Sequence, residues 1–564
     1  MEKVLEIRKC TACWAEFNIT DKDMELLDKV SPVFAWKKYK IPATTICPEC
    51  SLIKRLAWRN ERNLYRRKCD ATWKSIISMF SPDKGYTVFE QSEWWSDRWD
   101  PKSYWREFDF SKTFFAQFNE LMHDVPQVSL AVQDSDNSEY TNYAINNKNC
   151  YLTFGWDYSQ DCEYGNFQFY TNNCVDFYWL IKCENCYECI NCNECFKTTY
   201  SRDSKNLTDC HFCLECNSCN DCIGCTNLSN KKCYLFNKPS TKEEIDKIRA
   251  SFSSFSKLNE FKAKAEEFFA WETFKFADIR MSENCTWDKI FSSKNCNNCF
   301  VAETCEDLKD VYIWINCKDV RNSSLVGFWS QYVYDSFWIT SGVNLTFTAY
   351  AWWNNRDMFY TNQCYNNCSN LFGCIWLRGQ SYCILNKQYT KEEYEAIVPK
   401  IIEHMISTWE WWEFFPASVS QFWYNESVAS EYFPLSKEKA IEKWFNWSDY
   451  ENPKPEVSKV IPASKLPDNI SDIPDDILNW AVLCEKTERP FRIIKAELDF
   501  YRKQKLPVPR KHPDERHLDR MKNRNNMKLY DRKCDSCWID IKTTYAPDRT
   551  EKILCEDCYN KLMK

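Results

Sequence analysis

The chain has 564 residues and a net charge of −7, and these properties bound what it can be. The length suggests three or four structural units rather than one core. The start lacks the apolar run of a secretory signal, and no stretch of about eighteen apolar residues occurs, so the sequence predicts a cytoplasmic protein without membrane contact. The 34 cysteines are then expected to stay reduced, and because only 5 histidines are present, a tetrahedral metal site must use mainly thiolates.

Basic ends flank an acidic middle. Residues 1–75 contain 16 Lys and Arg against 10 Asp and Glu, and residues 484–564 contain 21 against 14. The ends therefore carry +6 and +7, which leaves −20 on the middle. Two interpretations remain open: the ends meet a nucleic acid or another acidic partner, or they dock on the protein's own middle.

A duplication relates the two ends of the chain. Residues 67–95 align without a gap on residues 532–560, and the same register continues upstream. Each end is expected to hold an intact and a degenerate finger, at 8–66 and 67–95 in the first copy and at 532–560 and 484–531 in the second. The ligand positions of the degenerate fingers hold Cys69, Thr72, Glu90 and Glu93 in the first copy, and Cys484, Thr487, His512 and Glu515 in the second.

Two sets of four cysteines are predicted to bind structural Zn²⁺. A Cys-x2-Cys turn presents two thiolates, and two such turns brought together by folding close a tetrahedron without an open position. The first site would use Cys10, Cys13, Cys47 and Cys50. The second site would use Cys534, Cys537, Cys555 and Cys558.

The middle of the chain has cysteine at short, regular intervals. Asn-Cys or Asp-Cys pairs recur every twelve residues at 150, 162 and 174, and cysteine then recurs every third residue from 183 to 195 and from 210 to 225. A second duplication aligns residues 224–245 on residues 373–394. This period favours a parallel β-solenoid in which Asn turns the corners and inward cysteines form a ladder. A multi-metal thiolate cluster is the alternative interpretation.

The predicted fold class is mixed α+β, with duplicated zinc-finger modules at both ends of a duplicated, cysteine-rich, parallel β-solenoid-like body that also contains helical segments. Apolar residues at helical spacing mark the segments 241–275 and 390–412 as helical. The expected units are a zinc-finger module with a helical extension at 1–125, a first solenoid repeat at 126–240, a helical connector at 241–282, a second solenoid repeat at 283–389, helices with a Pro-rich linker at 390–475, and a second zinc-finger module at 476–564.

The first finger resembles a group of short bacterial probable zinc-ribbon domains. The residues that carry this resemblance are Cys10, Cys13, Phe17, Ile19, Thr20, Cys47, Pro48 and Cys50. Through Arg59–Asp70, Trp94–Pro101 and the last Cys-x2-Cys turn, most of the chain is similar to an uncharacterised family of bacterial proteins with cysteine-rich middles. The resemblance implies a treble-clef-like finger near the N-terminus and a zinc ribbon near the C-terminus, but no known activity. The chain departs from the zinc-ribbon group at Trp14, where Gly is usual, and at Ser51, where Arg is usual.

The sequence favours a binding function over catalysis. A nucleic-acid contact would rest on the basic residues Arg55, Arg59, Arg62, Arg66, Arg67, Lys68, Arg516, Arg520 and Arg524. Those charges could instead pair with acidic neighbours in a scaffold that binds other proteins. A carbohydrate-active β-solenoid enzyme is the third hypothesis, although no carboxylate pair can be singled out as acid and base.

Overall fold

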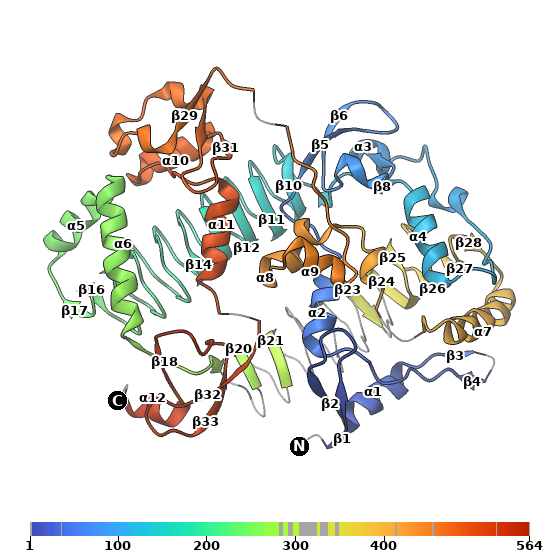
Figure 1. Ribbon diagram of the computed structural model, residues 1–564. Helices are drawn as coiled ribbons and strands as arrows, with labels where there is room; N and C mark the ends of the chain where they lie inside the picture. Colours follow the sequence, from blue (N-terminus) through green and yellow to red (C-terminus); the bar gives the residue numbers. More distant parts are fainter. Residues whose placement is uncertain are drawn as a thin grey trace.

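The computed structural model describes residues 3–34, 36–280, 282, 286–291, 297–303, 324–326, 337–343, 349–411, 414–453, 456–525 and 527–562. They form a mixed α/β structure in which two stacks of short parallel strands are flanked by helices and small hairpins (Figure 1). Within the described residues, no helix is long and apolar enough to cross a lipid bilayer.

The N-terminal module contains three hairpins with helices after each of them. The first part comprises β1 (Val4–Lys9), β2 (Glu16–Thr20), α1 (Asp21–Val30), β3 (Val33–Phe34), β4 (Lys37–Lys38) and α2 (Pro48–Leu56). The second part comprises β5 (Tyr65–Lys68), β6 (Ser75–Ser78), β7 (Val88–Phe89), α3 (Gln91–Trp94), α4 (Phe114–Asp124) and β8 (Gln127–Val128). Proline suits the first position of α2, because its missing N–H would have no partner within the helix.

The first strand stack winds with a repeat of twelve residues. Its strands are β9 (Val132–Gln133), β10 (Tyr140–Ile145), β11 (Tyr151–Asp157), β12 (Glu163–Phe169), β13 (Val175–Ile181), β14 (Ile190–Asn193), β15 (Asn220–Ile223) and β16 (Lys232–Leu235). Neighbouring strands are parallel, and most paired residues lie twelve positions apart, as Glu163 and Val175 do. Single bridges continue this offset between β14 and β15. Each coil of the chain therefore stacks on the coil before it through backbone hydrogen bonds.

Nearly every third residue of this stack has a left-handed backbone conformation. Across β13 and its flanks, Asn173, Asp176, Trp179, Lys182 and Asn185 have φ values of 51°, 54°, 61°, 51° and 55°. Asn and Asp tolerate this conformation better than other non-glycine residues, which explains their frequency here. The chain changes direction at each such residue, and the cysteines that follow Asn173 and Asn185 are fully buried.

Cysteine side chains fill the interior of the first stack. The cysteines from Cys150 to Cys225 form one buried cluster with a few larger apolar side chains. Their thiols donate to backbone carbonyls: Cys186 Sγ lies 3.5 Å from the carbonyl oxygens of Glu184 and Cys195. Because Cys195 lies nine residues further along the chain, each thiol of this kind links two adjacent coils.

Two further groups of strands follow, β19 to β21 and β22 to β28, and together they are called the second stack. Its described strands are β19 (Ile279–Arg280), β20 (Thr286–Phe291), β21 (Asn297–Glu303), β22 (Ser324–Val326), β23 (Phe337–Val343), β24 (Ala349–Phe359), β25 (Asn362–Tyr365), β26 (Ser369–Phe372), β27 (Ser381–Ile384) and β28 (Lys387–Gln388). The twelve-residue offset recurs in the parallel pairing of Ser369 with Ser381. Of the cysteines in this part, Cys285, Cys296, Cys305 and Cys317 lie outside the described residues, Cys299 lies in β21, and Cys364, Cys368, Cys374 and Cys383 are buried.

Helices connect the two stacks and follow the second. They are α5 (Lys242–Ser251), α6 (Phe255–Ala270), α7 (Lys391–Ser407), α8 (Val428–Tyr432) and α9 (Lys437–Glu442). The capping signals of the duplicated segments are used: Thr241 Oγ1 accepts from the Glu244 N–H at 3.2 Å, and Thr390 and Glu393 form a complete capping box. Equivalent threonines therefore begin equivalent helices.

The C-terminal module docks on the body and touches the N-terminal module. Its elements are β29 (Lys459–Pro462), β30 (Trp480–Leu483), β31 (Pro490–Phe491), α10 (Lys495–Gln504), α11 (Pro513–Lys522), β32 (Tyr530–Lys533), β33 (Asp540–Thr543), β34 (Lys552–Leu554) and α12 (Glu556–Leu562). α11 crosses the first strand stack and contacts β13 (Figure 1), while β34 pairs in parallel with β18 (Thr273–Lys275). Lys528 Nζ lies 3.1 Å from Glu49 Oε2, so the two ends of the sequence meet in space.

Candidate metal centres

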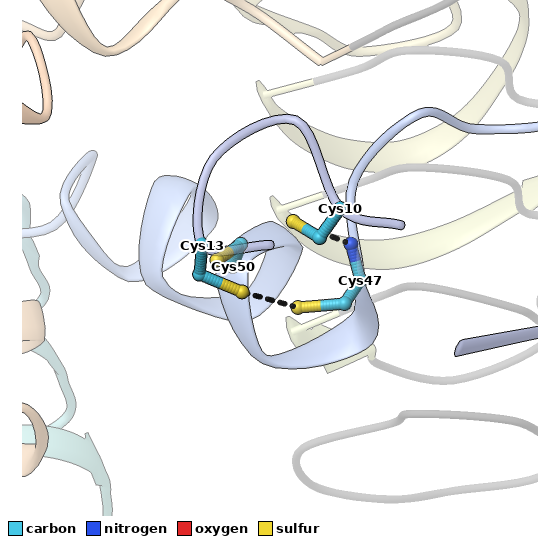
Figure 2. A group of neighbouring side chains, drawn as sticks. All are labelled: Cys10, Cys13, Cys47 and Cys50. Carbon is cyan, nitrogen blue, oxygen red and sulfur yellow. Dashed lines mark hydrogen bonds between the residues drawn. The ribbon is translucent and has the colours of Figure 1, made fainter. Parts of the chain in front are cut away.

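The first centre is built from the β1–β2 hairpin and the start of α2. Cys10 and Cys13 lie in the hairpin turn, Cys47 is the N-cap of α2, and Cys50 lies in the first helical turn. The four Sγ atoms lie within 4.8 Å of one another, and Cys13 Sγ is 3.6 Å from Cys47 Sγ (Figure 2). A hairpin turn and a helix N-terminus thus bring together two cysteine pairs that are far apart in sequence.

The second centre repeats this construction near the other end of the chain. Cys534 and Cys537 lie in the β32–β33 turn, while Cys555 and Cys558 lie at the start of α12. These four Sγ atoms also lie within 4.8 Å of one another, with 3.7 Å between Cys537 Sγ and Cys555 Sγ. All eight cysteines predicted as ligands are thereby brought together in the two expected groups.

The sulfur atoms of both groups lie close enough together for a tetrahedral thiolate site. A metal–sulfur distance of about 2.3 Å, as for Zn²⁺, requires tetrahedral sulfur–sulfur distances of about 3.8 Å. One sulfur–sulfur pair in each group, at 3.6 and 3.7 Å, fits that requirement. Backbone N–H groups also point at sulfur: the Cys47 N–H donates to Cys10 Sγ at 3.2 Å, and the Cys555 N–H donates to Cys534 Sγ at 3.3 Å. Such donors stabilise a thiolate, which is the form that binds metal.

Local hydrogen bonds favour the thiolate before any metal binds. A hydrogen bond from the Cys50 thiol is the main cause that lowers the pKa of Cys47 to about 5. At Cys534, burial acts to raise the pKa, but backbone N–H groups of Cys537, Cys555 and Ser536 outweigh it and lower the pKa to about 6. At neutral pH each centre therefore already offers an ionised sulfur to a cation.

The degenerate fingers keep the frame of the intact fingers but gather fewer ligands. In the first, Cys69 Sγ accepts from the N–H groups of Thr72 and Glu90 at 3.4 and 3.3 Å, and Thr72 Oγ1 donates to Glu90 Oε1 at 2.9 Å. In the second, His512 is the N-cap of α11, and its Nδ1 accepts from the Asp514 N–H at 3.2 Å. Throughout the described part of the chain, only the two four-cysteine groups bring three or more potential ligands together.

Two cysteines of the second stack, Cys364 and Cys374, are poorly suited to bind a metal ion. Cys364 and Cys374 are fully buried, and desolvation raises the pKa of both thiols well above its ordinary value. Cys374 Sγ lies 3.5 Å from the carbonyl oxygen of Phe372 and 3.3 Å from that of Cys383. A protonated thiol can donate to these carbonyls, and a thiolate would be repelled by them, which favours the thiol ladder over the metal cluster at these positions.

Most of the basic residues considered for nucleic-acid contact are turned inward. Those that are buried, or have side chains less than one-tenth exposed, are Arg55, Arg59, Arg62, Arg67, Arg516, Arg520 and Arg524. Only Arg66 and Lys68 of this set are exposed. Their basic segments pack on the body: the guanidinium of Arg59 lies 4.1 Å from the Tyr143 ring centroid, and that of Arg524 lies 4.0 Å from the Tyr178 ring centroid. These contacts support the interpretation in which the basic ends dock on the acidic middle.

The acidic partners of these arginines were missed by the sequence analysis. Arg520 Nη1 lies 3.0 Å from Asp176 Oδ1 and 3.1 Å from Glu188 Oε1. Arg516 pairs with Asp176 and with Glu497, whose Oε1 lies 3.1 Å from Arg516 Nη1. Asp176 belongs to β13 and Glu497 to α10, so these charges join the C-terminal module to the first strand stack. No local signal marks such partners, since Asp176 precedes Arg516 by 340 residues.

A buried carboxylate at this interface is expected to make stability depend on pH. His517 Nε2 lies 2.9 Å from Glu431 Oε2, and burial raises the pKa of Glu431 to about 7 despite the nearby Arg62 and Arg524. Between about pH 4.5 and 7, the folded chain therefore holds a proton at Glu431 that the unfolded chain loses. The contribution of this protonated group to the stability of the fold is fully present below that window and is lost as the pH rises through it.

Gln cannot ionise, so the stability of Glu431→Gln relative to that of the unmodified chain should increase by about 3 kcal/mol as the pH rises from 4.5 to 7.5. Amide hydrogen exchange in α11 at both pH values measures this difference. Burial lowers the pKa of His517 well below its ordinary value. The contribution of His517 to stability therefore rises with pH, but it does so in the variant and in the unmodified chain alike. An unchanged difference between the two pH values would contradict the prediction.

No family model, no curated protein and no solved structure matches this chain.

Proposed function

We propose that this chain is a zinc-binding scaffold without catalytic activity, in which two structural Zn²⁺ ions stabilise the finger modules at its ends. The observation that carries the proposal is the convergence of eight cysteines into two groups of four, each with its Sγ atoms within 4.8 Å of one another. Four protein ligands leave no open position for water or substrate, which is typical of structural rather than catalytic zinc. The hairpin-and-helix frame of each centre is consistent with the treble-clef-like and zinc-ribbon fingers that the resemblance implies.

We infer that the body between the fingers is a parallel β-solenoid. Four bridges in one stretch of twelve residues support this: Glu184, Tyr187, Ile190 and Asn193 each pair with the residue twelve positions later. A chain that pairs at four places in each coil, with a left-handed residue between successive places, forms a four-sided coil. Such a body would offer long, regular faces to other proteins.

The scaffold is favoured over a nucleic-acid contact because most of the candidate arginines are already paired within the chain. A contact through Arg66 and Lys68 alone would give a shallow salt dependence, with a slope of roughly 1 to 2 in log affinity against log salt. Filter retention of RNA at several salt concentrations separates the two functions. A steep slope that Arg66→Ala and Lys68→Ala leave unchanged would count against the scaffold.

The zinc proposal predicts two Zn²⁺ ions per folded chain. Native mass spectrometry of the protein purified without chelators should show this stoichiometry, because each complete thiolate tetrahedron holds one ion and the described body thiols donate to carbonyls. Prolonged treatment with a strong chelator should remove both ions and expose the terminal modules to proteolysis. A folded chain that contains no metal would contradict the proposal, and a count well above two would favour a cluster in the body.

A further inference from the structure

Outside the two strand stacks, left-handed backbone geometry is concentrated at tryptophan. Within the described residues of 3–133 and 387–562, eight residues other than glycine have a positive φ, and six of these are tryptophan. They are Trp14 (63°), Trp36 (69°), Trp73 (59°), Trp409 (63°), Trp444 (64°) and Trp538 (62°). A bulky side chain is disfavoured in this conformation because its Cβ crowds the backbone, whereas glycine has no Cβ and adopts it freely.

Two of these tryptophans end helices at the position that glycine usually occupies. After α7, the Trp409 N–H donates to the Ile406 carbonyl at 3.3 Å, and the Glu410 N–H donates to the Met405 carbonyl at 2.8 Å. The same pair of hydrogen bonds closes α9, with Trp444 as the left-handed residue. This is the Schellman arrangement, which requires a left-handed residue just after the helix and most often has glycine there.

Three others occupy one equivalent position in three fingers. The N–H groups of Trp14, Trp73 and Trp538 each donate to the carbonyl of the first cysteine of the turn, at 2.9 to 3.0 Å. This turn places two ligand positions side by side, so its left-handed residue is a geometric requirement of the finger. Trp36 lies in the two-residue loop between β3 and β4, which is another place where a positive φ is needed.

The indoles of these six residues contrast with tryptophans that belong to the core. The six side chains are 71–100% exposed, whereas Trp94 is fully buried and its indole N–H donates to the Pro126 carbonyl at 3.0 Å. The indole N–H of Trp99 donates to the Trp94 carbonyl at 2.7 Å. The composition also shows an excess of tryptophan over glycine, because the chain has 26 Trp and only 8 Gly. A typical protein of this length contains about 40 glycines.

We infer that the natural protein carries glycine at positions 14, 36, 73, 409, 444 and 538, because its source reads as glycine a codon that another genetic code reads as tryptophan. UGA is a codon with both meanings, whereas UGG specifies tryptophan. Glycine at position 14 then agrees with the pattern of the zinc-ribbon group, in which glycine is usual at that place. The finger turns consequently present no aromatic surface to a partner, and the scaffold must bind through other faces.

The codons and the protein mass test this inference directly. The gene should contain UGA at the six positions and UGG at the codons of Trp94 and Trp99. Peptides of the protein isolated from its source should have the mass of glycine at positions 14, 73 and 538, and the mass of tryptophan at 94 and 99. UGG codons or tryptophan-containing peptides at 14, 73 and 538 would overturn the inference.

Variants of the chain expressed with tryptophan test the conformational argument independently. Trp14→Gly, Trp73→Gly and Trp538→Gly should each reduce local opening of their hairpin by about five- to thirty-fold, as measured by amide hydrogen exchange. Trp94→Gly is the matched control and should increase opening around α3, because that indole is buried and hydrogen-bonded. Equal or greater opening in all three hairpin variants would show that glycine is not preferred there.

Discussion

Cys534→Ser is expected to lower the zinc content from two ions per chain to one and to unfold the C-terminal finger. Cys534 is fully buried, and its sulfur is one of the four that converge between the β32–β33 turn and α12. A structural Zn²⁺ contributes roughly 10 to 16 kcal/mol of apparent binding free energy in zinc-finger peptides, so a small unit depends on it for folding. Native mass spectrometry gives the metal count, and loss of hydrogen-exchange protection from β32 to α12 reports the unfolding.

Cys69→Ser is the matched control for this experiment. Cys69 occupies the equivalent turn position in a degenerate finger, is equally buried, and accepts the equivalent N–H bond from Glu90 at 3.3 Å. It should lose some local stability but keep both zinc ions, because no second cysteine shares its site. Retention of two ions by Cys534→Ser, or loss of one by Cys69→Ser, would contradict the assignment of the metal centres.

The two four-cysteine groups could be predicted because the spacing within each cysteine pair is a local signal. Within each pair the cysteines are three positions apart, and a turn or the first turn of a helix then brings their sulfur atoms together regardless of the rest of the fold. The starts of two helices could be predicted from equally local signals, since the equivalent threonines at 241 and 390 are the N-caps of α5 and α7. The twelve-residue pairing offset also follows a spacing visible at Cys150, Cys162 and Cys174, because each coil repeats the same inward position.

The sequence left two roles open for the basic residues, because the choice between them depends on distant partners. Arg516 and Arg520 lie on one face of a helix that reads as a nucleic-acid contact when only its own sequence is considered. Their carboxylate partner Asp176 occupies a left-handed corner of the first strand stack. A sequence pattern can place an Asp at such a corner but contains no information on which helix will pack against it.

Besides Cys534→Ser, a replacement of Asp176 should also cause a large loss of stability. Its carboxylate is fully buried and accepts from Arg520 at 3.0 Å and from Arg516, while the Tyr501 hydroxyl lies 3.5 Å away. Asp176→Asn keeps the shape of the side chain but leaves two guanidinium groups with less than their full counter-charge in a site without water access. Breaking a buried ion pair in this way costs about 3 to 5 kcal/mol.

The cost should appear as detachment of the C-terminal module from the first strand stack. Hydrogen exchange in α10 and α11 should accelerate by roughly two to three and a half orders of magnitude, since about 1.4 kcal/mol corresponds to a factor of ten. Asp475→Asn is the control, because Asp475 is 84% exposed and its pairing with Arg502 at 2.6 Å should be worth less than about 1 kcal/mol. If the two variants exchanged alike, the buried charges would not hold the module in place, and the arginines would again be candidates for contact with an external partner.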